Sequence, residues 1–490
     1  MADVNLVTHR DSLKNALFKQ DATTFNMANQ WGRVPEHFLQ TRYLTPTVTA
    51  PATGGTTEVT LARWGPFLTR PVLEFKSQVG NNLRHVFGAG FLAIEYIEVY
   101  SNGAFVSRRY GWQMLREYLL HFTDEERLGW DAQVGCVPDT VTNTAYGAAP
   151  ITIAGQAGPG VLSAAGLESN IDGASDTVRF RVPLVSSFFW QYIVPMPLLD
   201  DGTIKLVIKF AEPRDFISPT NSTTSAALAA TLSAVRLECS YILAHSNVQE
   251  QLIEDYRRND REFHYLVLDH APEIQDLSSI TATEYTLDVN SAKDKDIAYM
   301  TFGLVAQAGA IGDGSGASAN EDLIDNIISS NTVTGGSGNT ALRRHPHAYM
   351  SCIKQFAIYG SQERLTGRDD VTADRWFNEI MREKFSGRVL ENCYWNYAGA
   401  STSASANIGA GHPSLLHGWA WSTDATAAQY NSLNSFDFTQ VSDPQIKFTT
   451  FAALNATAAN TATVSSVRVF IDVAYYNVYR IRGFQLEKLK

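Results

Sequence analysis

The length and composition of this chain predict two or three folded domains. Its 490 residues exceed the roughly 100 to 200 of one ordinary domain, and 44% hydrophobic content with 25 Phe, 20 Tyr and 9 Trp excludes a disordered chain. A net charge of −11, with no Lys/Arg run longer than a pair such as Arg343-Arg344, excludes a broad phosphate-binding face, so we expect no direct nucleic-acid contact. No apolar stretch of about 18 residues occurs, and charges interrupt the first thirty residues without an apolar h-region, so we expect neither a transmembrane span nor a secretory signal.

Short runs of β-branched and aromatic residues, bounded by Gly, Pro, Asn and Asp, predict an all-β chain. A near-neutral N-terminal arm is expected over residues 1–50. Six strands are then predicted at residues 57–64, 67–75, 92–100, 177–184, 203–210 and 234–244. After a short helix at 249–258, six more follow at residues 282–289, 296–306, 350–359, 388–397, 445–451 and 466–479. With weak strands missed, this pattern predicts two tandem eight-stranded jelly rolls (β-sandwiches), at 51–250 and 251–490, with short helices in the loops.

Three kinds of segment indicate the surroundings of individual strands and the positions of long loops. Residues 178–182, VRFRV, alternate with period two, which predicts one core face and one wet face. Residues 470–476, FIDVAYY, are almost continuously apolar, which predicts a strand between two packed layers or against a neighbouring subunit. Ala/Gly/Ser/Thr-rich stretches predict long loops, which either pack between chains or vary freely on the surface, at 147–175, 307–341, 398–411 and 452–465.

Part of the first half recurs in the second half. Residues 94–119 contain a strand, a polar turn and a helix-like run, and residues 353–381 repeat that order about 259 positions later. Downstream, 204–210 match 446–451 and 235–248 match 467–478, so the order is kept while the offset falls to about 242 and then 232. Loops that change length between retained strands produce such drift. The pattern predicts two similar domains in tandem, because solenoid repeats are only about 20 to 50 residues long.

Motifs for metal or phosphate binding are incomplete. His345-Pro346-His347 provides the HxH pair of a metal-binding strand, but the glutamate that follows it in cupins is missing. The glycine-rich segment 312–316 lacks the Lys-Ser/Thr of a P-loop, and Ile324 stands where an EF-hand loop needs a carboxylate. GxSxG, HExxH and CxxC are all absent. We therefore assign no catalytic, cofactor-binding or metal-binding residue, and expect no cofactor and no enzymatic activity.

Other polar residues have structural interpretations. Asp370 and Thr372 precede the second helix-like run, which predicts that they cap its N-terminus. The four cysteines are widely spaced, which predicts thiols in core positions rather than a disulfide framework: Cys136, Cys239, Cys352 and Cys393.

Several segments, taken in chain order, carry a family resemblance. In the first half these are a strand and Gly turn leading to RYGW at 109–112 and a helix, then VPL at 182–184, FFW at 188–190 and PMPLL at 195–199 before the strand 204–210. The strand 235–244 and the helix with LIE at 252–254 follow. The second half adds IYG at 358–360 and the closing strand VAYYNVYRI at 473–481. Over about residues 55–485 the chain resembles the double jelly-roll major capsid proteins of large icosahedral double-stranded DNA viruses.

This resemblance implies a structural role. In that family three copies form a trimer, and two jelly rolls per chain give six similar domains in a block that tiles an icosahedral shell. It implies a homotrimer with capsomer-capsomer contacts, penton and minor capsid proteins as partners, and a place in the virion after synthesis in the host cytoplasm or nucleus. The arm lacks the Gly-Asn-Pro and Phe-Lys opening of many members, so its contacts stay open, as does contact with an internal membrane. The alternatives are a carbohydrate- or receptor-binding double β-sandwich and a bicupin-like metalloenzyme.

Overall fold

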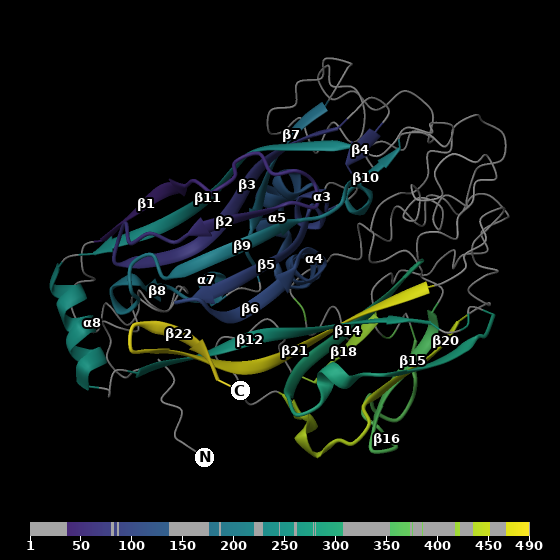
Figure 1. Ribbon diagram of the computed structural model, residues 1–490. Coiled ribbons are helices and arrows are strands. Elements are labelled where there is room, and N and C mark those ends of the chain that lie inside the picture. The colour runs from purple at the N-terminus through teal and green to yellow at the C-terminus, as the bar shows by residue number, and fades with distance from the viewer. Residues whose placement is uncertain are drawn as a thin grey trace.

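The computed structural model contains two β-sandwiches that lie side by side and are joined through helix α8 (Ser246–Arg258) (Figure 1). It describes residues 37–79, 83–85, 88–136, 176–185, 188–219, 229–244, 246–258, 262–277, 279, 281–306, 353–372, 375, 385, 417–421, 435–450 and 467–489. Within these ranges, every helix is too short or too polar to cross a membrane.

The first sandwich has the strand order of a jelly roll. One sheet has the order β1-β11-β3-β7, formed by β1 (His37–Leu44), β11 (Ala230–Ala244), β3 (Phe67–Val79) and β7 (Asp176–Pro183), with the short β8 (Val194–Pro195) also paired to β3. The facing sheet has the order β2-β9-β5-β6, formed by β2 (Thr56–Thr60), β9 (Ile204–Phe210), β5 (Ile94–Ser101) and β6 (Ala104–Tyr110). A separate small ladder joins β4 (Leu83–His85) to β10 (Ile217–Pro219).

Aromatic side chains fill the core between these sheets. Phe75 on β3 lies 5.5 Å, between ring centroids, from both Phe180 on β7 and Phe210 on β9, so its ring touches both layers. Burying one such ring contributes about 1.5–3 kcal/mol. The predicted alternation of β7 is confirmed, because Phe180 is buried while Arg179 and Arg181 face outward and are partly exposed.

Helices of the first jelly roll lie in its connections. In the described residues they are α3 (Ala89–Leu92), α4 (Gly111–His121), α5 (Asp124–Val134) and α7 (Phe188–Gln191), with the 3-10 turns η2 (Met196–Leu198) and η3 (Pro213–Asp215). Helix α4 immediately follows β6, and Figure 1 shows it on the side of the first jelly roll that faces the second.

The second sandwich repeats the strand order of the first. One sheet has the order β12-β21-β14-β18, formed by β12 (Glu262–Asp276), β21 (Val467–Arg482), β14 (Asp296–Ala306) and β18 (His417–Ala420), with β19 (Phe436–Asp437) on β14 and β22 (Gln485–Lys488) on β21. The other has the order β13-β20-β15-β16, formed by β13 (Glu284–Asp288), β20 (Gln445–Thr450), β15 (Ile353–Gly360) and β16 (Glu363–Arg364), with β17 (Val371–Thr372) also on β15. Two 3-10 turns, η4 (Asn290–Ala292) and η6 (Phe438–Gln440), also belong to the described part of this sandwich.

The internal repeat predicted from the sequence is confirmed strand by strand. The three matched segments are β5 with β15, β9 with β20 and β11 with β21, and each pair holds the same place in its sheet. The pairing of β5 with β9 shifts register between Ile94 and Tyr96, and that of β15 with β20 shifts between Ile353 and Gln355, so a bulge recurs at the same position. The hairpin turns also agree, because both central residues have positive φ: Asn102 and Gly103 in one, Ser361 and Gln362 in the other.

Some strands were not predicted. Strand β1 falls within residues 1–50, where we expected an arm, but it pairs with β11 along its whole length and so belongs to the first jelly roll. Strand β12 was also not predicted, because its charged residues and Pro272 are unusual in a strand. Proline is tolerated there because β12 is an edge strand. The strand expected at 388–397, the helix-like run after Arg375, and the four small-residue stretches lie outside the described residues, apart from Phe385. The division at 250 and 251 falls within α8 and stays a prediction.

Candidate functional site

The contact between the two jelly rolls is the candidate functional site, because buried charged side chains gather there. The first jelly roll supplies them from β6 and α4, and the second from β12 and β21. They are Arg109, Arg116, Glu117, Asp269, His270 and Asp472. Burying a charge costs free energy unless it is paired, so such a cluster fixes how the two surfaces meet.

Helix α4 is set in place by its first residue. A Cβ on Gly111 would lie 2.1 Å from the backbone oxygens of both Ile94 and Phe91, so only glycine allows the helix to start this close to β5. The backbone N–H of Tyr110 donates to Oε1 of Gln113 over 3.1 Å, which satisfies one donor at the helix start. The helix therefore begins directly at the end of β6 and presents Gln113, Arg116 and Glu117 to the second jelly roll.

Asp269 on β12 is the centre of the first group of charges. Arg109 of the first jelly roll forms a buried ion pair with it, and Lys488 Nζ lies 2.5 Å from its Oδ2. The hydroxyls of Tyr475 and Tyr479 donate to the same oxygen over 3.1 and 3.3 Å. Burial opposes ionisation of Asp269, but the positive charges of Arg109 and Lys488 outweigh it and hold its pKa well below the usual range. The carboxylate is therefore charged and bridges the domains.

His270, the next residue, is the centre of the second group. Its Nδ1 lies 2.7 Å from Oδ2 of Asp472, and its Nε2 lies 3.3 Å from Oε2 of Glu117 on α4. Gln113 Nε2 donates to the other oxygen of Asp472 over 2.6 Å. Burial alone would lower the pKa of His270, but the two carboxylates raise it to about 9. At neutral pH an imidazolium thus sits between one carboxylate from each jelly roll.

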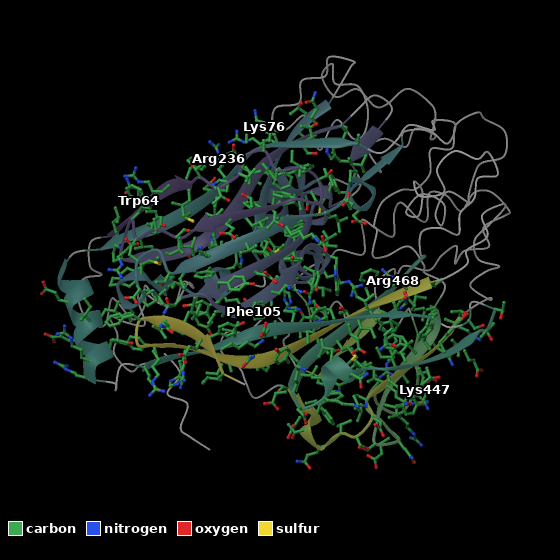
Figure 2. The ribbon with its side chains drawn as sticks, viewed as in Figure 1. Trp64, Lys76, Phe105, Arg236, Lys447 and Arg468 are labelled. Atoms are coloured by element: carbon green, nitrogen blue, oxygen red, sulfur yellow. The ribbon has the colours of Figure 1, made fainter. Side chains whose placement is uncertain are left out.

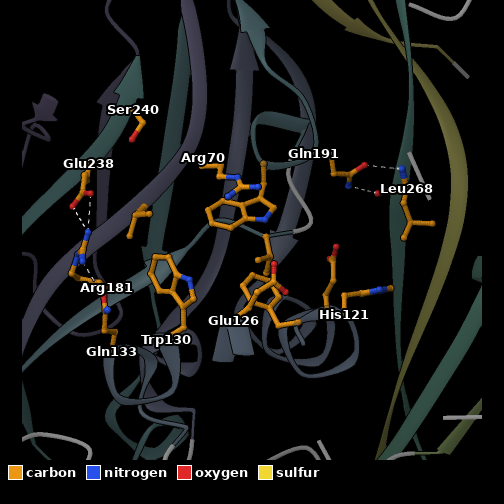
Figure 3. Close-up of a pocket in the computed structure, with 15 residues that line it drawn as sticks. Arg70, His121, Glu126, Trp130, Gln133, Arg181, Gln191, Glu238, Ser240 and Leu268 are labelled. Atoms are coloured by element: carbon orange, nitrogen blue, oxygen red, sulfur yellow. Dashed lines mark hydrogen bonds and ion pairs between the residues drawn. The ribbon is translucent and has the colours of Figure 1, made fainter. Parts of the chain in front are cut away.

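The first jelly roll also covers the free edge of β12. Gln191 Nε2 donates to the carbonyl oxygen of Leu268 over 2.9 Å, and the N–H of Leu268 donates to Gln191 Oε1 over 3.0 Å, so one amide side chain replaces a neighbouring strand (Figure 3). The Tyr192 hydroxyl donates to the carbonyl of Leu266, and Arg109 Nη1 donates to that of His270 over 3.0 Å. Exposed strand edges recruit other strands, and these side chains prevent that.

Aromatic contacts surround the polar groups. Phe188 of α7 stacks on Tyr479 at 5.8 Å and meets Tyr265 edge to face at 4.9 Å. Trp112 of α4 meets Phe470 at 5.4 Å, and His121 Nε2 lies 2.9 Å from the Tyr299 hydroxyl. The apolar run at 470–476 thus packs between its own sandwich and the first jelly roll, which confirms the prediction that it lies between two layers.

A cavity of about 480 Å³ opens beside this contact (Figure 3). Trp130 and Trp190 line it, and Arg181 is paired with Glu238 at 2.7 Å and donates to Gln133 over 3.0 Å. Its lining holds a single hydroxyl, on Ser240, and a single imidazole, on His121, and these lie on opposite sides of the cavity. The Ser240 hydroxyl is therefore not set against the His121 imidazole as a nucleophile against its base.

Many of the residues considered from the sequence lie outside the part of the chain that the structure describes. His345, His347 and the segment 312–316 lie outside the described residues, as do Cys352 and Cys393. In the described ranges, no group of three or more His, Cys, Asp or Glu is arranged to hold a metal ion. Cys136 and Cys239 are buried free thiols, as predicted. Thr372 accepts a bond from the N–H of Arg375 over 3.4 Å, consistent with a cap, whereas Asp370 instead pairs with Arg364.

The residues of the contact were not predicted from the sequence. One signal was present in the sequence. The polar pair Asp269-His270 directly follows the apolar run YLVL at 265–268, and Asp472 is the one charged residue within the apolar run at 470–476. A charge in the middle of a buried strand needs a partner. The pattern does not identify that partner, because Arg109 lies 160 positions from Asp269 in the sequence and Gln113 lies 359 positions from Asp472.

Comparison with known proteins identifies the fold. No protein-family model matches the chain, and no curated protein matches it by sequence. Among solved structures, PBCV-1 VP54, fitted into a reconstruction of the virophage Sputnik, matches with a TM-score of 0.64 and 13% identity over 94% of this chain and 98% of that one. The Faustovirus major capsid protein matches with a TM-score of 0.57 and 9% identity over 91% and 90%. This chain therefore has the double jelly-roll fold of these viral capsid proteins, as the sequence resemblance predicted.

Proposed function

We propose that this chain is the structural major capsid protein of an icosahedral virus, and that three copies form a pseudo-hexagonal capsomer. The observation that carries the proposal is the repeat of one jelly roll, with the same strand order, bulge and turn, in a fixed contact within one chain. Two similar blocks at a set angle allow three chains to present six similar domains. The whole-length match to capsid proteins supports this assignment over a carbohydrate-binding or metalloenzyme role.

The buried charges explain how the contact supports this role. A capsomer that tiles a shell needs its two domains in one relative orientation, and paired buried charges penalise every other orientation. Arg109 with Asp269 and His270 with Glu117 each cross the contact. In this function the protein works in the virion, binds copies of itself and neighbouring capsomers, and meets penton and minor capsid proteins; it needs no cofactor and no direct nucleic-acid contact.

Light scattering of the purified protein tests the proposal. A trimer of 54.0 kDa chains has a mass of 162 kDa. A protein that stays at 54 kDa at high concentration contradicts the trimer. Metal analysis and glycan-array binding test the two alternatives: stoichiometric iron, manganese or zinc would favour the metalloenzyme, and glycan binding without assembly would favour the receptor-type protein.

A further inference from the structure

The cavity beside the contact between the jelly rolls has the size and the position of a ligand site. Its volume of about 480 Å³ lies within the range of about 300 to 1,000 Å³ that is usual for small-molecule pockets. Such pockets occur preferentially where domains meet. Here strands and helices of the first jelly roll face Leu268 on β12 of the second, so a molecule bound in the cavity touches both.

Two indole rings form the apolar part of the cavity wall. Trp130 on α5 and Trp190 on α7 meet edge to face, with their ring centroids 6.3 Å apart, and Phe122 stacks on Trp190 at 6.2 Å. Both indoles are only partly buried, so they keep surface that a ligand can cover. Flat aromatic walls of this kind favour a planar apolar ligand, because it can stack on the rings.

A β-bulge places a guanidinium beside the indoles. Arg70 and Pro71 of β3 lie opposite the single residue Cys239 of β11, so the chain of β3 bends out of the ladder at this point. Arg70 has a φ of 45°, in the left-handed region that arginine rarely adopts. Its Cζ atom lies 5.8 Å from the centroid of the Trp190 ring, and its side chain lines the cavity (Figure 3).

The jelly roll itself does not require this strained arginine. The matching strands of the second jelly roll, β14 and β21, also contain a bulge, with Ala298 as the extra residue. Ala298 is buried and does not have a positive φ. The left-handed conformation of Arg70 is therefore specific to the strand beside the cavity, and strained backbone of this kind clusters at ligand sites.

The charges around the cavity favour an anionic ligand. Its three carboxylates are already engaged, in the pairs Glu238 with Arg181 (2.7 Å), Glu117 with His270 (3.3 Å) and Glu126 with the backbone N–H of Thr123 (3.0 Å). Arg181 also lies over the Trp130 ring, 6.0 Å from its centroid, as Arg70 lies over Trp190. A cation stacked on either indole would meet a guanidinium, whereas a carboxylate, sulfonate or phosphate would be attracted.

We propose that this cavity binds a small organic anion, with a planar apolar body against Trp130 and Trp190 and its acidic group on Arg70. The proposal goes beyond the capsid role and does not depend on it. Because Leu268 of the second jelly roll lines the same cavity, the bound anion adds a contact between the two jelly rolls and stabilises the folded chain.

Titration of the full chain with anilinonaphthalene sulfonate, followed by energy transfer from tryptophan, tests the proposal. This fluorescent probe has a planar aromatic body and one sulfonate, and phenylnaphthylamine has the same body without the charge. We expect one anionic probe to bind per chain, and the neutral probe to bind about 10-fold more weakly or worse. Equal affinity for the two probes, or binding of neither, overturns the proposal.

Arg70→Asn removes the guanidinium, and asparagine tolerates the left-handed backbone. It should weaken binding of the anionic probe about 10-fold or more and leave that of the neutral probe nearly unchanged. Arg42→Asn is the matched control, because Arg42 also lies over an indole, that of Trp64, at 5.4 Å. Trp64 is on the side of the first jelly roll away from the second (Figure 2), so this variant should bind the anionic probe like the wild type. If Arg70→Asn binds it as tightly as Arg42→Asn, the proposal is wrong.

Hydrogen exchange of the wild-type protein locates the probe without a variant. Saturating anionic probe should slow exchange of the amides of α5 and of β12 around Leu268, which border the cavity. The amides of β20, in the other sheet of the second jelly roll, should exchange as before. Unchanged exchange in both α5 and β12 overturns the proposal, as does slowing that is confined to β20.

Discussion

Replacing His270 should remove a specific dependence of stability on pH. The folded pKa of this imidazole is about 9, above the value of about 6.5 expected in the unfolded chain. Between these values the folded state holds a proton that the unfolded state has lost, so stability falls as the pH rises. The stabilisation is complete below about pH 6.5 and is lost above about pH 9.

The magnitude follows from that difference in pKa. The pKa of His270 rises from 6.5 to about 9 on folding, and at about 1.36 kcal/mol for each pKa unit this difference corresponds to about 3 kcal/mol. Solvent does not screen the interaction, because the His270 side chain is 0% exposed and its Asp472 partner 2%. The wild-type free energy of unfolding should therefore contain a loss of about 3 kcal/mol between pH 6 and pH 10, measured by urea denaturation at each pH.

His270→Gln should abolish this component, and the variant should already be destabilised at pH 6, where Glu117 and Asp472 lose the cation between them. Other groups also titrate in this range, so the comparison needs a second histidine on the same strand. His264→Gln is that control, because the His264 side chain is 23% exposed and pairs with the single carboxylate of Glu262, at 3.6 Å, among the described residues. If His270→Gln and the wild type show the same change with pH, the imidazolium does not hold the two jelly rolls together.

Three further substitutions test other parts of the contact. Arg109→Met leaves Asp269 buried without its main partner and should cost about 3–5 kcal/mol in urea denaturation. Arg468→Met is the control and should cost less than about 1 kcal/mol, because the side chains of Arg468 and its partner Asp276 are 37% and 56% exposed. Gln191→Met leaves the N–H and carbonyl of Leu268 unpaired and should cost about 2–4 kcal/mol with faster exchange of the β12 amides; unchanged exchange would show that Gln191 does not seal the edge. Gly111→Ala should lower the melting temperature by several degrees because of its contact with Ile94 and Phe91, while Gly129→Ala, with no atom within 4 Å, should raise it slightly.

The fold was largely predictable because its strands carry local signals. The alternation at Val178 to Val182, the turn at Asn102-Gly103 and its repeat at Ser361-Gln362 are properties of short segments, and each specifies a strand or a hairpin without distant partners. Strands β1 and β12 were missed because they are edge strands, where one side of the strand makes no ladder and polar residues or Pro272 are tolerated. The apolar pattern of β1 is correspondingly weak, and in β12 the apolar run YLVL ends at the charged pair Asp269-His270.

The contact between the jelly rolls was not predictable in the same way. The oddity of Asp472 in an apolar strand is visible in the sequence, but its partners His270 and Gln113 depend on how two domains pack. Gln191 has no local signal at all, since an amide that replaces a strand looks like any other polar residue until the edge of β12 lies beside it. Interfaces between domains depend on three-dimensional proximity, which short-range periodicity does not record.

Electron microscopy of the purified oligomer tests the central claim most directly. If one duplicated chain supplies two equivalent corners, class averages viewed along the symmetry axis should show six lobes around a threefold axis, in a particle of 162 kDa. A particle with two or four chains, or a 54 kDa monomer with two lobes at every concentration, would contradict the claim that the duplication allows three chains to form a six-cornered block.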